Sequence, residues 1–417
     1  MSPVPRPLWP LDAESGGFVL LIMPIFCGLM QPMPPILKPW SEFRQQMPVT
    51  RQLAYLDHAA VAPLSGPAGE AIGEWAEQAV ERGDTVWPQW ARRVEQVRAV
   101  AAQLIGADAD EIAFVPNTTT GISLVAEGFP WRSGDNVVTL ANEFPSNQFP
   151  WMNLQVHGVQ TRRLPVESGR VDLARILDAC DDRTRIVSVS WVGYASGWRV
   201  DVESLARAAH KRGIYLFLDA IQGLGVFPLD VRRSGVDFLA ADGHKWMLGP
   251  EGAGLLYVRR EHLDLLRPLN VGWNSVVDAH DFSRCELDLR PTAARYEGGS
   301  ANMAGIAALG ASLDLLASFG LSPAASPIAE RVVQLVDQAA ARLKEIGAVI
   351  RSPQEHDHSS GILSFELPGA DSSAVRQRCL SQGVVLSVRH GWLRISPHAY
   401  NDQQDLERLV DALAAGR

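Results

Sequence analysis

The sequence has 417 residues, of which 47% are hydrophobic and 20% are charged. This length and composition are typical of a soluble globular protein with about two to three domains. The net charge is −9 and lysine and arginine form no cluster, so we expect no nucleic acid and no anionic membrane as partner, but a small-molecule ligand. The four cysteines (Cys27, Cys180, Cys285 and Cys379) have no metal-like spacing, which favours the reducing cytoplasm over a disulfide framework.

The N-terminal segment contains an apolar stretch at residues 18–30. That stretch is too short to cross a bilayer and is interrupted by Pro24. The residues around it lack the basic cluster and the small-residue cleavage site of a signal peptide. We therefore interpret residues 1–35 as a leader that is either disordered or the result of a wrongly assigned start, with the true start at Met30 or Met33. A membrane anchor is the alternative.

From residue 52 onwards, short apolar runs alternate with amphipathic helical patterns, which predicts β-α-β units around a mostly parallel sheet. The expected buried strands are 112–115, 136–140, 185–190, 214–219, 236–240 and 254–258. A crossover helix is expected at 201–213, begun by Asp201 and ended by Gly213, and an apolar helix at 302–320. The remaining chain predicts a smaller α+β domain, with helices at 329–347, 371–382 and from Asp402, and strands at 361–367, 384–388 and 392–396.

Polar residues follow several of these strands, where ligands of an open parallel sheet bind. Thr118 and Thr119 begin a predicted helix that suits a phosphate group, although simple helix capping is an alternative. Phe144 follows the next strand and could lie flat on a planar ring or pack in the core. Asp219 ends a strongly apolar strand, where a carboxylate is costly unless it meets a cation or a donor; a helix cap is the alternative.

Lys245 follows the next strand, in "AADGHKWMLGPEG". Cationic or apolar neighbours would lower its pKa from about 10.4 towards 7 to 8 and make it a nucleophile and base. A solvated lysine in a surface turn is the alternative. Together, the anion-binding helix start, the aromatic side chain, the buried carboxylate and the activated amine match pyridoxal 5′-phosphate (PLP), whose phosphate, ring, ring nitrogen and aldehyde each need one of these groups.

The stretch from Tyr55 to about residue 413 resembles the class V aminotransferase superfamily of PLP fold type I, which includes cysteine desulfurases, selenocysteine lyases, isopenicillin N epimerase and kynureninase. The motifs that carry the resemblance occur in family order: "YLDHAAVAP", "NTTTGISLVA", "EFPSNQFPW", "FLDAIQGLG", "DGHKWMLGPEGAGLLYV", "RYEGGSANMAGI" and "WLRISPHAYN". The resemblance implies an α/β large domain, with a mostly parallel sheet of seven strands flanked by helices, at residues 66–310. It also implies a small α+β domain at 311–417, on which residues 36–65 pack.

The resemblance further implies that Lys245 forms a Schiff base with PLP and that Asp219 holds the pyridine nitrogen. The other implied cofactor contacts are Thr118, Thr119 and His244 at the phosphate, Phe144 on the ring, and Gln222 and Tyr194 near the ring oxygen. Arg394 matches the arginine that binds the substrate carboxylate. Arg389, His390 and His58 are further candidates for substrate binding, with surface placement an equal alternative for the first two. Ser300 matches a hydroxyl residue that reaches the partner's site, so a homodimer with shared sites is expected.

Three features depart from cysteine desulfurases. No cysteine lies between Ser387 and Arg394, where those enzymes carry their nucleophile, and Cys379 falls in a helix, where packing is its expected role. Phe144 stands where desulfurases have a histidine. Asp242 replaces a phosphate-binding serine or threonine, and we expect it to turn away or to orient His244. His356 and His358 could indicate a metal site, but a polar loop is the preferred interpretation.

The sequence therefore predicts a cytoplasmic PLP-dependent enzyme that acts at the Cα atom of an amino acid. A transaminase or a Cα–Cβ or C–S lyase is preferred to a cysteine desulfurase or selenocysteine lyase, because the loop cysteine is missing. Epimerisation is also open. A non-catalytic dimeric scaffold is disfavoured, because the residues that would carry the chemistry are all retained.

Overall fold

The computed structural model describes residues 39–167 and 169–415. The predicted leader at 1–35 lies outside these residues. Within the part of the chain that is described, no helix is both long and apolar enough to span a membrane.

A seven-stranded sheet, in the order β2-β8-β7-β6-β5-β3-β4, forms the centre of the large part of the protein. Its strands are β2 (Ile112–Val115), β3 (Asn136–Leu140), β4 (Gln160–Leu164), β5 (Thr184–Ser190), β6 (Tyr215–Asp219), β7 (Phe238–Asp242) and β8 (Gly254–Val258). All neighbouring strands are parallel except at β8, which is antiparallel to both β2 and β7. The predicted mostly parallel sheet is confirmed. The sequence analysis missed β4, a partly exposed edge strand that lacks an apolar run.

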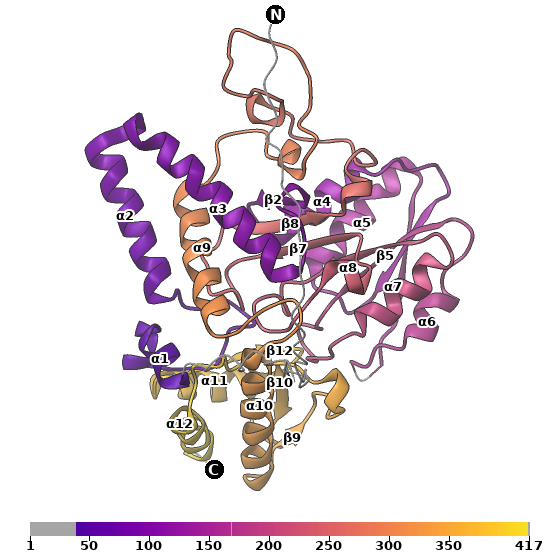
Figure 1. The fold of residues 1–417 in the computed structure, drawn as a ribbon. Coiled ribbons are helices and arrows are strands. Elements are labelled where there is room, and N and C mark those ends of the chain that lie inside the picture. Colours follow the sequence, from indigo (N-terminus) through magenta and orange to yellow (C-terminus); the bar gives the residue numbers. More distant parts are fainter. Residues whose placement is uncertain (1–38, 168, 416–417) are drawn as a thin grey trace, which may run out of the picture. The chain divides into compact units, whose positions relative to one another are not determined.

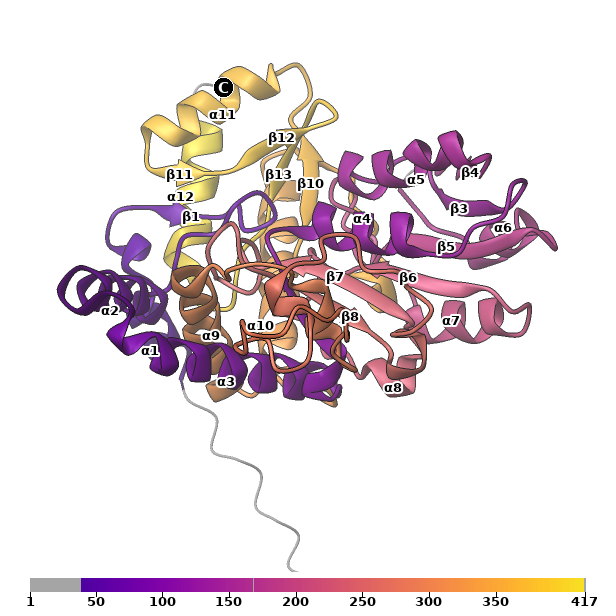
Figure 2. The ribbon, with the colours of Figure 1, turned by 90° about the horizontal axis from the view of Figure 1, so that it is seen from above.

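Helices cover both faces of this sheet (Figures 1 and 2). The helices α4 (Thr118–Gly128) and α5 (Phe149–Asn153) lie on one face, and α3 (Trp87–Ile105), α6 (Leu173–Asp178), α7 (Val202–His210) and α8 (Val231–Ser234) lie on the other. Strand β6 shows why both faces are buried. Leu216 and Leu218 join the hydrophobic core with α7, whereas Phe217 joins the core with α4 and α5, as expected for a parallel sheet between two helical layers.

Two long helices, α2 (Gly66–Arg82) and α9 (Met303–Ser318), pack on each other, and α9 also packs on α3. A four-stranded antiparallel sheet with the order β12-β13-β10-β9 forms the C-terminal part. This part contains β9 (Val349–Ile350), β10 (Leu363–Glu366), β12 (Ser387–Arg389), β13 (Trp392–Ile395), α10 (Pro327–Glu345), α11 (Ser372–Ser381) and α12 (Gln403–Ala414).

The N-terminal segment lies against this C-terminal part. After α1 (Trp40–Gln45), strand β1 (Ala54–Tyr55) pairs in parallel with β11 (Val384–Val385). The predicted domain boundary at residue 310 falls inside α9, and the division into domains stays a prediction.

The carboxyl ends of the central strands gather several polar residues at one edge of the sheet. Ser190, Asp219 and Asp242 end β5, β6 and β7, and Ser190 pairs with Asp219 in the ladder. Helix α4 begins directly after β2 at the antiparallel side of the sheet. Gly121 allows this helix to approach β7 closely, because a Cβ atom there would lie 2.7 Å from the Cβ of Ala240.

Because of this close approach, a glycine-to-alanine substitution should change the free energy of unfolding in opposite directions in α4 and in α2. Gly121→Ala should lower the free energy of unfolding by about 1–3 kcal/mol, because the added methyl group overpacks the α4–β7 contact. Gly73→Ala, in α2, meets nothing within 4 Å and should raise stability by about 0.5–1 kcal/mol, since alanine favours a helix more than glycine does. Urea denaturation of the two variants measures both values; equal effects would contradict the tight packing at Gly121.

Candidate active site

One cavity at the carboxyl edge of the sheet is lined by most of the predicted site residues. They are Thr118, Thr119, Phe144, Tyr194, Asp219, Gln222, His244, Lys245, Arg389 and Arg394. The strands and loops that carry them are far apart in the sequence, and the sheet brings their ends together. Lys245 and Asp219 thus face the same space, as one pyridine ring between them requires.

The amine and the carboxylate in this cavity are both nearly inaccessible to water. Lys245 is 8% exposed and Asp219 is 2% exposed. Burial lowers the pKa of Lys245 to about 8; Asp219 raises it, and Arg394 and Arg389 lower it further. Burial raises the pKa of Asp219 to about 6, against the backbone N–H of Ile221 and the charge of Lys245, which lower it. At neutral pH, Asp219 is therefore mostly ionised and part of Lys245 carries a free amine.

Asp219 retains hydrogen-bonding capacity towards the cavity. Its side chain accepts one hydrogen bond, from the backbone N–H of Ile221 at 3.2 Å, and within the described chain no other side-chain partner is found. A buried carboxylate can accept several donors. A protonated ring nitrogen in the cavity would supply the missing one.

The start of α4 forms an anion-binding corner. The side chain of Asn117 accepts from the N–H of Thr120 at 2.9 Å, whereas the N–H groups of Thr118 and Thr119 have no partner among the residues described. The Thr118 hydroxyl accepts from the N–H of Asp242 at 3.0 Å, and the Thr119 hydroxyl donates to Ser146 at 2.8 Å. The free N–H groups and the positive end of the helix dipole suit a phosphate.

Asp242 lies next to His244 in this corner. The Nδ1 atom of His244 lies 2.8 Å from Oδ2 of Asp242, whose Oδ1 accepts from the N–H of Gly243 at 2.7 Å. Nδ1 of His244 nevertheless makes no hydrogen bond among the described residues, so the expected role of Asp242 in orienting His244 stays a prediction. His244 lines the cavity, and its Nε2 remains available there.

An aromatic side chain and an amide complete the wall. Lys245 Nζ lies 5.6 Å from the ring centroid of Phe144, a residue that is 44% exposed. The Oε1 atom of Gln222 accepts from the indole N–H of Trp246 at 2.9 Å, and Nε2 donates to the carbonyl of Ala59 at 3.0 Å. Because an indole only donates, Trp246 fixes which end of the amide it meets. The second N–H of Gln222 therefore remains for a ligand.

Arg394 is held rigidly but keeps a free pair of donors. Its Nε donates to Ser387 at 3.1 Å, Nη1 to the carbonyl of Tyr194 at 2.6 Å, and Nη2 to Asp57 at 3.1 Å. Burial lowers the pKa of Arg394 to about 10, and Asp57 opposes this shift. Each terminal nitrogen has a second N–H, so the guanidinium can still grip a carboxylate with two hydrogen bonds.

Sequence reasoning missed three polar residues of this region. Asp57 is the ionic partner of Arg394, and Ser190 lines the cavity. Glu143 lies behind Ser190 and accepts both its N–H, at 2.8 Å, and its hydroxyl. Burial raises the pKa of Glu143 to about 7. Asp57 and Glu143 directly precede the predicted residues His58 and Phe144, so the motifs pointed to the right segments.

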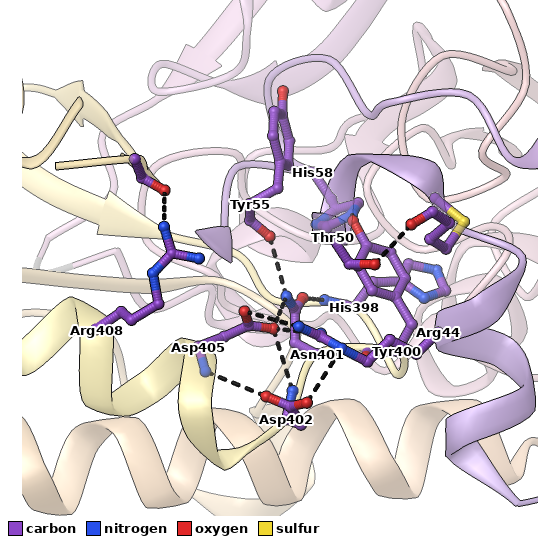
Figure 3. Close-up of polar contacts among 12 residues, drawn as sticks. Arg44, Thr50, Tyr55, His58, His398, Tyr400, Asn401, Asp402, Asp405 and Arg408 are labelled. Carbon is purple, nitrogen blue, oxygen red and sulfur yellow. Dashed lines mark hydrogen bonds and ion pairs between the residues drawn. The ribbon is translucent and has the colours of Figure 1, made fainter. Parts of the chain in front are cut away.

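His58 does not line the cavity, which corrects its predicted role in substrate binding. It is fully buried, with Nδ1 2.8 Å from the carbonyl of Ser396 and Nε2 2.7 Å from the hydroxyl of Tyr400. Burial lowers its pKa to about 4, so the ring is neutral and both nitrogens are engaged. Figure 3 shows it beside the network in which Arg44 contacts Asp405, at 2.7 Å. His58 thus joins the N-terminal segment to the C-terminal part.

Ser300 also lies outside this cavity and lines a neighbouring one together with Thr120 and Gly252. Its predicted contact with a partner's cofactor, and the homodimer itself, stay predictions. His356 and His358 form a short helical turn before β10. Among the described residues, no group of three or more histidine, cysteine, aspartate or glutamate side chains could hold a metal ion.

None of the three cysteines that the structure describes, Cys180, Cys285 and Cys379, lines the cavity. Cys379 is buried in α11, and burial raises the pKa of its thiol. The hairpin between β12 and β13 turns within two residues, His390 and Gly391. Both have a positive φ, of 52° and 81°. This hairpin therefore has no loop long enough to carry a thiol into the cavity.

The donors in the cavity fit PLP. The free N–H groups at the start of α4 and Nε2 of His244 suit its phosphate, and the exposed ring of Phe144 suits stacking. The unfilled acceptor capacity of Asp219 suits its ring nitrogen. Lys245 supplies the amine that would bind its aldehyde.

The depressed pKa of Lys245 predicts its reactivity. In the cofactor-free protein, acetylation of Lys245 by a limiting reagent should increase with pH around a midpoint near 8, against about 10.4 for an ordinary lysine. Asp219→Asn should move the midpoint to lower pH, because it removes a charge that favours the protonated amine. Peptide mapping by mass spectrometry resolves the site, since the chain has only four lysines, Lys38, Lys211, Lys245 and Lys344. A midpoint near 10 would contradict the buried environment.

Comparison with known proteins agrees with this geometry. A probable cysteine desulfurase of Methanothermobacter thermautotrophicus is 32% identical over 89% of this chain and 97% of its own length. The apo cysteine desulfurase of Thermococcus onnurineus NA1 superposes with a TM-score of 0.81 at 26% identity, over 90% of this chain and 97% of the other. The cystine C–S lyase C-DES has the same fold, with a TM-score of 0.82 at 22% identity over 88% of this chain and 99% of its own. The model of the aminotransferase class-V family matches residues 54–409, so the chain belongs to the class V aminotransferase family of PLP-dependent enzymes.

Proposed function

We propose that the protein is a PLP-dependent lyase that removes the Cα proton of an amino acid and then releases a sulfur group from Cβ. With cysteine as the substrate, cysteine and water would give pyruvate, ammonia and hydrogen sulfide. The observation that carries this proposal is the content of the cavity: a base, a carboxylate-binding guanidinium and a buried acid line it, and no described cysteine does.

The chain's own residues divide the task among them. The two free N–H groups of Arg394 hold the substrate carboxylate and fix the orientation of the Cα–H bond. Lys245, as a neutral amine, takes the Cα proton. Bound PLP supplies an electron-withdrawing ring that accepts the charge left at Cα. Asp219, ionised at neutral pH, keeps the ring nitrogen protonated.

The choice of a C–S bond rests on the relatives, because the most similar of those described above is named a probable cysteine desulfurase. A desulfurase passes sulfur to its own cysteine, and here the corresponding hairpin has only His390 and Gly391 between its paired ends. Elimination needs no such acceptor. Desulfuration is nevertheless the second candidate, favoured by the relatives' names.

We also propose that the enzyme is a cytoplasmic homodimer. Ser300 supports the dimer, since it faces a cavity next to its own active site. In a symmetric pair it could contribute a hydroxyl group to the partner's cofactor.

Product analysis tests the proposed reaction. The PLP-loaded protein, incubated with cysteine, cystine or S-methylcysteine, should form pyruvate in amounts equal to the sulfur product. Alanine in place of pyruvate would indicate desulfuration. Alanine that appears only when pyruvate is added as an acceptor would indicate amino-group transfer. Either result would contradict the lyase proposal.

Two substitutions test the assigned residues. Lys245→Ala should lower kcat by about 10²–10⁴-fold, because the base is lost, and Asp219→Asn by about 10²-fold or more, because the charge that faces the ring nitrogen is lost. Asp357→Asn, at a side chain that is 95% exposed, is the matched control and should leave kcat within about twofold. Equal activity of Asp219→Asn and the control would contradict the role of Asp219.

A further inference from the structure

The hairpin that replaces a cysteine-bearing loop places a histidine next to a phenol of the cavity wall. The hydroxyl of Tyr194 lies 2.8 Å from Nε2 of His390, and Tyr194 lines the cavity whereas His390 is exposed to solvent. The pair therefore joins the interior of the site to water through one hydrogen bond. Neither residue has an acidic side chain as its partner among the described ion pairs.

The surroundings of Tyr194 fix its phenol in place. Its ring packs edge-on against Phe144, with ring centroids 5.3 Å apart, and Lys245 Nζ lies 5.6 Å from the same Phe144 ring. The backbone carbonyl of Tyr194 accepts from Arg394. The phenol thus shares one aromatic neighbour with Lys245, the predicted base, and the backbone of the same residue contacts Arg394, which is predicted to bind the substrate carboxylate. Burial raises its pKa, and Glu143 adds to this effect, while Arg389 and Arg394 oppose it, so the phenol keeps its proton at neutral pH.

The backbone of His390 is held in an uncommon conformation. Its φ of 52° is in the left-handed region, which costs energy for most residues with a side chain. An asparagine followed by glycine would suit this two-residue turn better. The turn itself therefore does not require an imidazole at this position.

We propose that Tyr194 is a catalytic acid, which gives its proton to the group leaving Cβ, and that His390 resupplies this proton from solvent. This inference rests on the proposed lyase function. When the Cβ–S bond breaks, its electron pair stays on sulfur. The O–H bond of Tyr194 breaks as the S–H bond forms, and the resulting phenolate takes the Nε2 proton of His390 in its protonated form. The neutral imidazole that remains then recovers a proton from solvent. No electrons are exchanged with any other reagent.

The test compares two substrates that differ in their need for an acid. Chloride leaves β-chloroalanine without a proton, whereas the methanethiolate of S-methylcysteine is strongly basic and benefits from one. In Tyr194→Phe, the ratio of initial kcat/KM for S-methylcysteine to that for β-chloroalanine should fall by about 10²-fold or more. The variant keeps the ring contact with Phe144 and the carbonyl that holds Arg394.

His390→Asn should lower the same ratio by a smaller factor, about tenfold, because water can replace the imidazole only in part. Asparagine tolerates the left-handed backbone, so the turn is preserved. His356→Gln, at a side chain that is 90% exposed, is the matched control and should not change the ratio. The solvent deuterium isotope effect should be larger with S-methylcysteine than with β-chloroalanine, and this difference should disappear in Tyr194→Phe.

The outcomes separate the proposed proton relay, from His390 through Tyr194 to the leaving group, from other roles of these two residues. If both substrates slow equally in Tyr194→Phe, the phenol only supports the hairpin, and the relay is overturned. If the affinity for PLP and its visible absorption change in Tyr194→Phe while the substrate ratio does not, the hydroxyl serves the cofactor, and the relay is again overturned. If the unaltered enzyme eliminates neither leaving group, the proposed lyase function itself is wrong, and the relay falls with it.

Discussion

The chemistry of the candidate site depends on the burial of the Lys245 amine and the Asp219 carboxylate in one cavity. Out of water, the charged form of each group is penalised, so the pKa of Lys245 falls to about 8 and that of Asp219 rises to about 6. Their mutual attraction limits both shifts. A lysine exposed to water would be almost wholly protonated at neutral pH, and its amine could neither attack an aldehyde nor remove a proton. The buried environment lowers the pKa of this lysine and so supplies the neutral amine that the proposed base needs.

The other parts of the site serve this pair. The parallel strands β5, β6 and β7 end at one edge, so Ser190, Asp219 and Asp242 lie there together. The C-terminal sheet brings Arg394 across from the other side, and Asp57 compensates its buried charge. A buried guanidinium that lost this partner would carry an uncompensated charge. The proposed binding of the substrate carboxylate therefore depends on the N-terminal segment that carries Asp57 as well as on the hairpin that carries Arg394.

Much of this arrangement could be predicted from the sequence, because the buried strands are apolar runs and the polar residues that follow them stand out. Strand β4 could not, since an edge strand such as Gln160–Leu164 needs no apolar run. The sequence led us to expect His58 at the site, whereas its neighbour Asp57 is the residue that contacts Arg394; this error also has a local cause. Asp57 forms a single β-bridge and His58 begins the turn that follows it, so recognising the motif did not decide which of the two met Arg394. Glu143 and the contact between Tyr194 and His390 depend on tertiary proximity, for which these segments carry no local signal.

Reductive trapping tests the central claim most directly. The PLP-loaded protein, treated with borohydride and digested, yields the peptide to which the cofactor has become permanently attached. We expect the label on Lys245, with the Asp219→Asn variant still labelled at the same residue but holding the cofactor more weakly. Label on Lys211 or Lys344, or label spread among the lysines, would contradict the account.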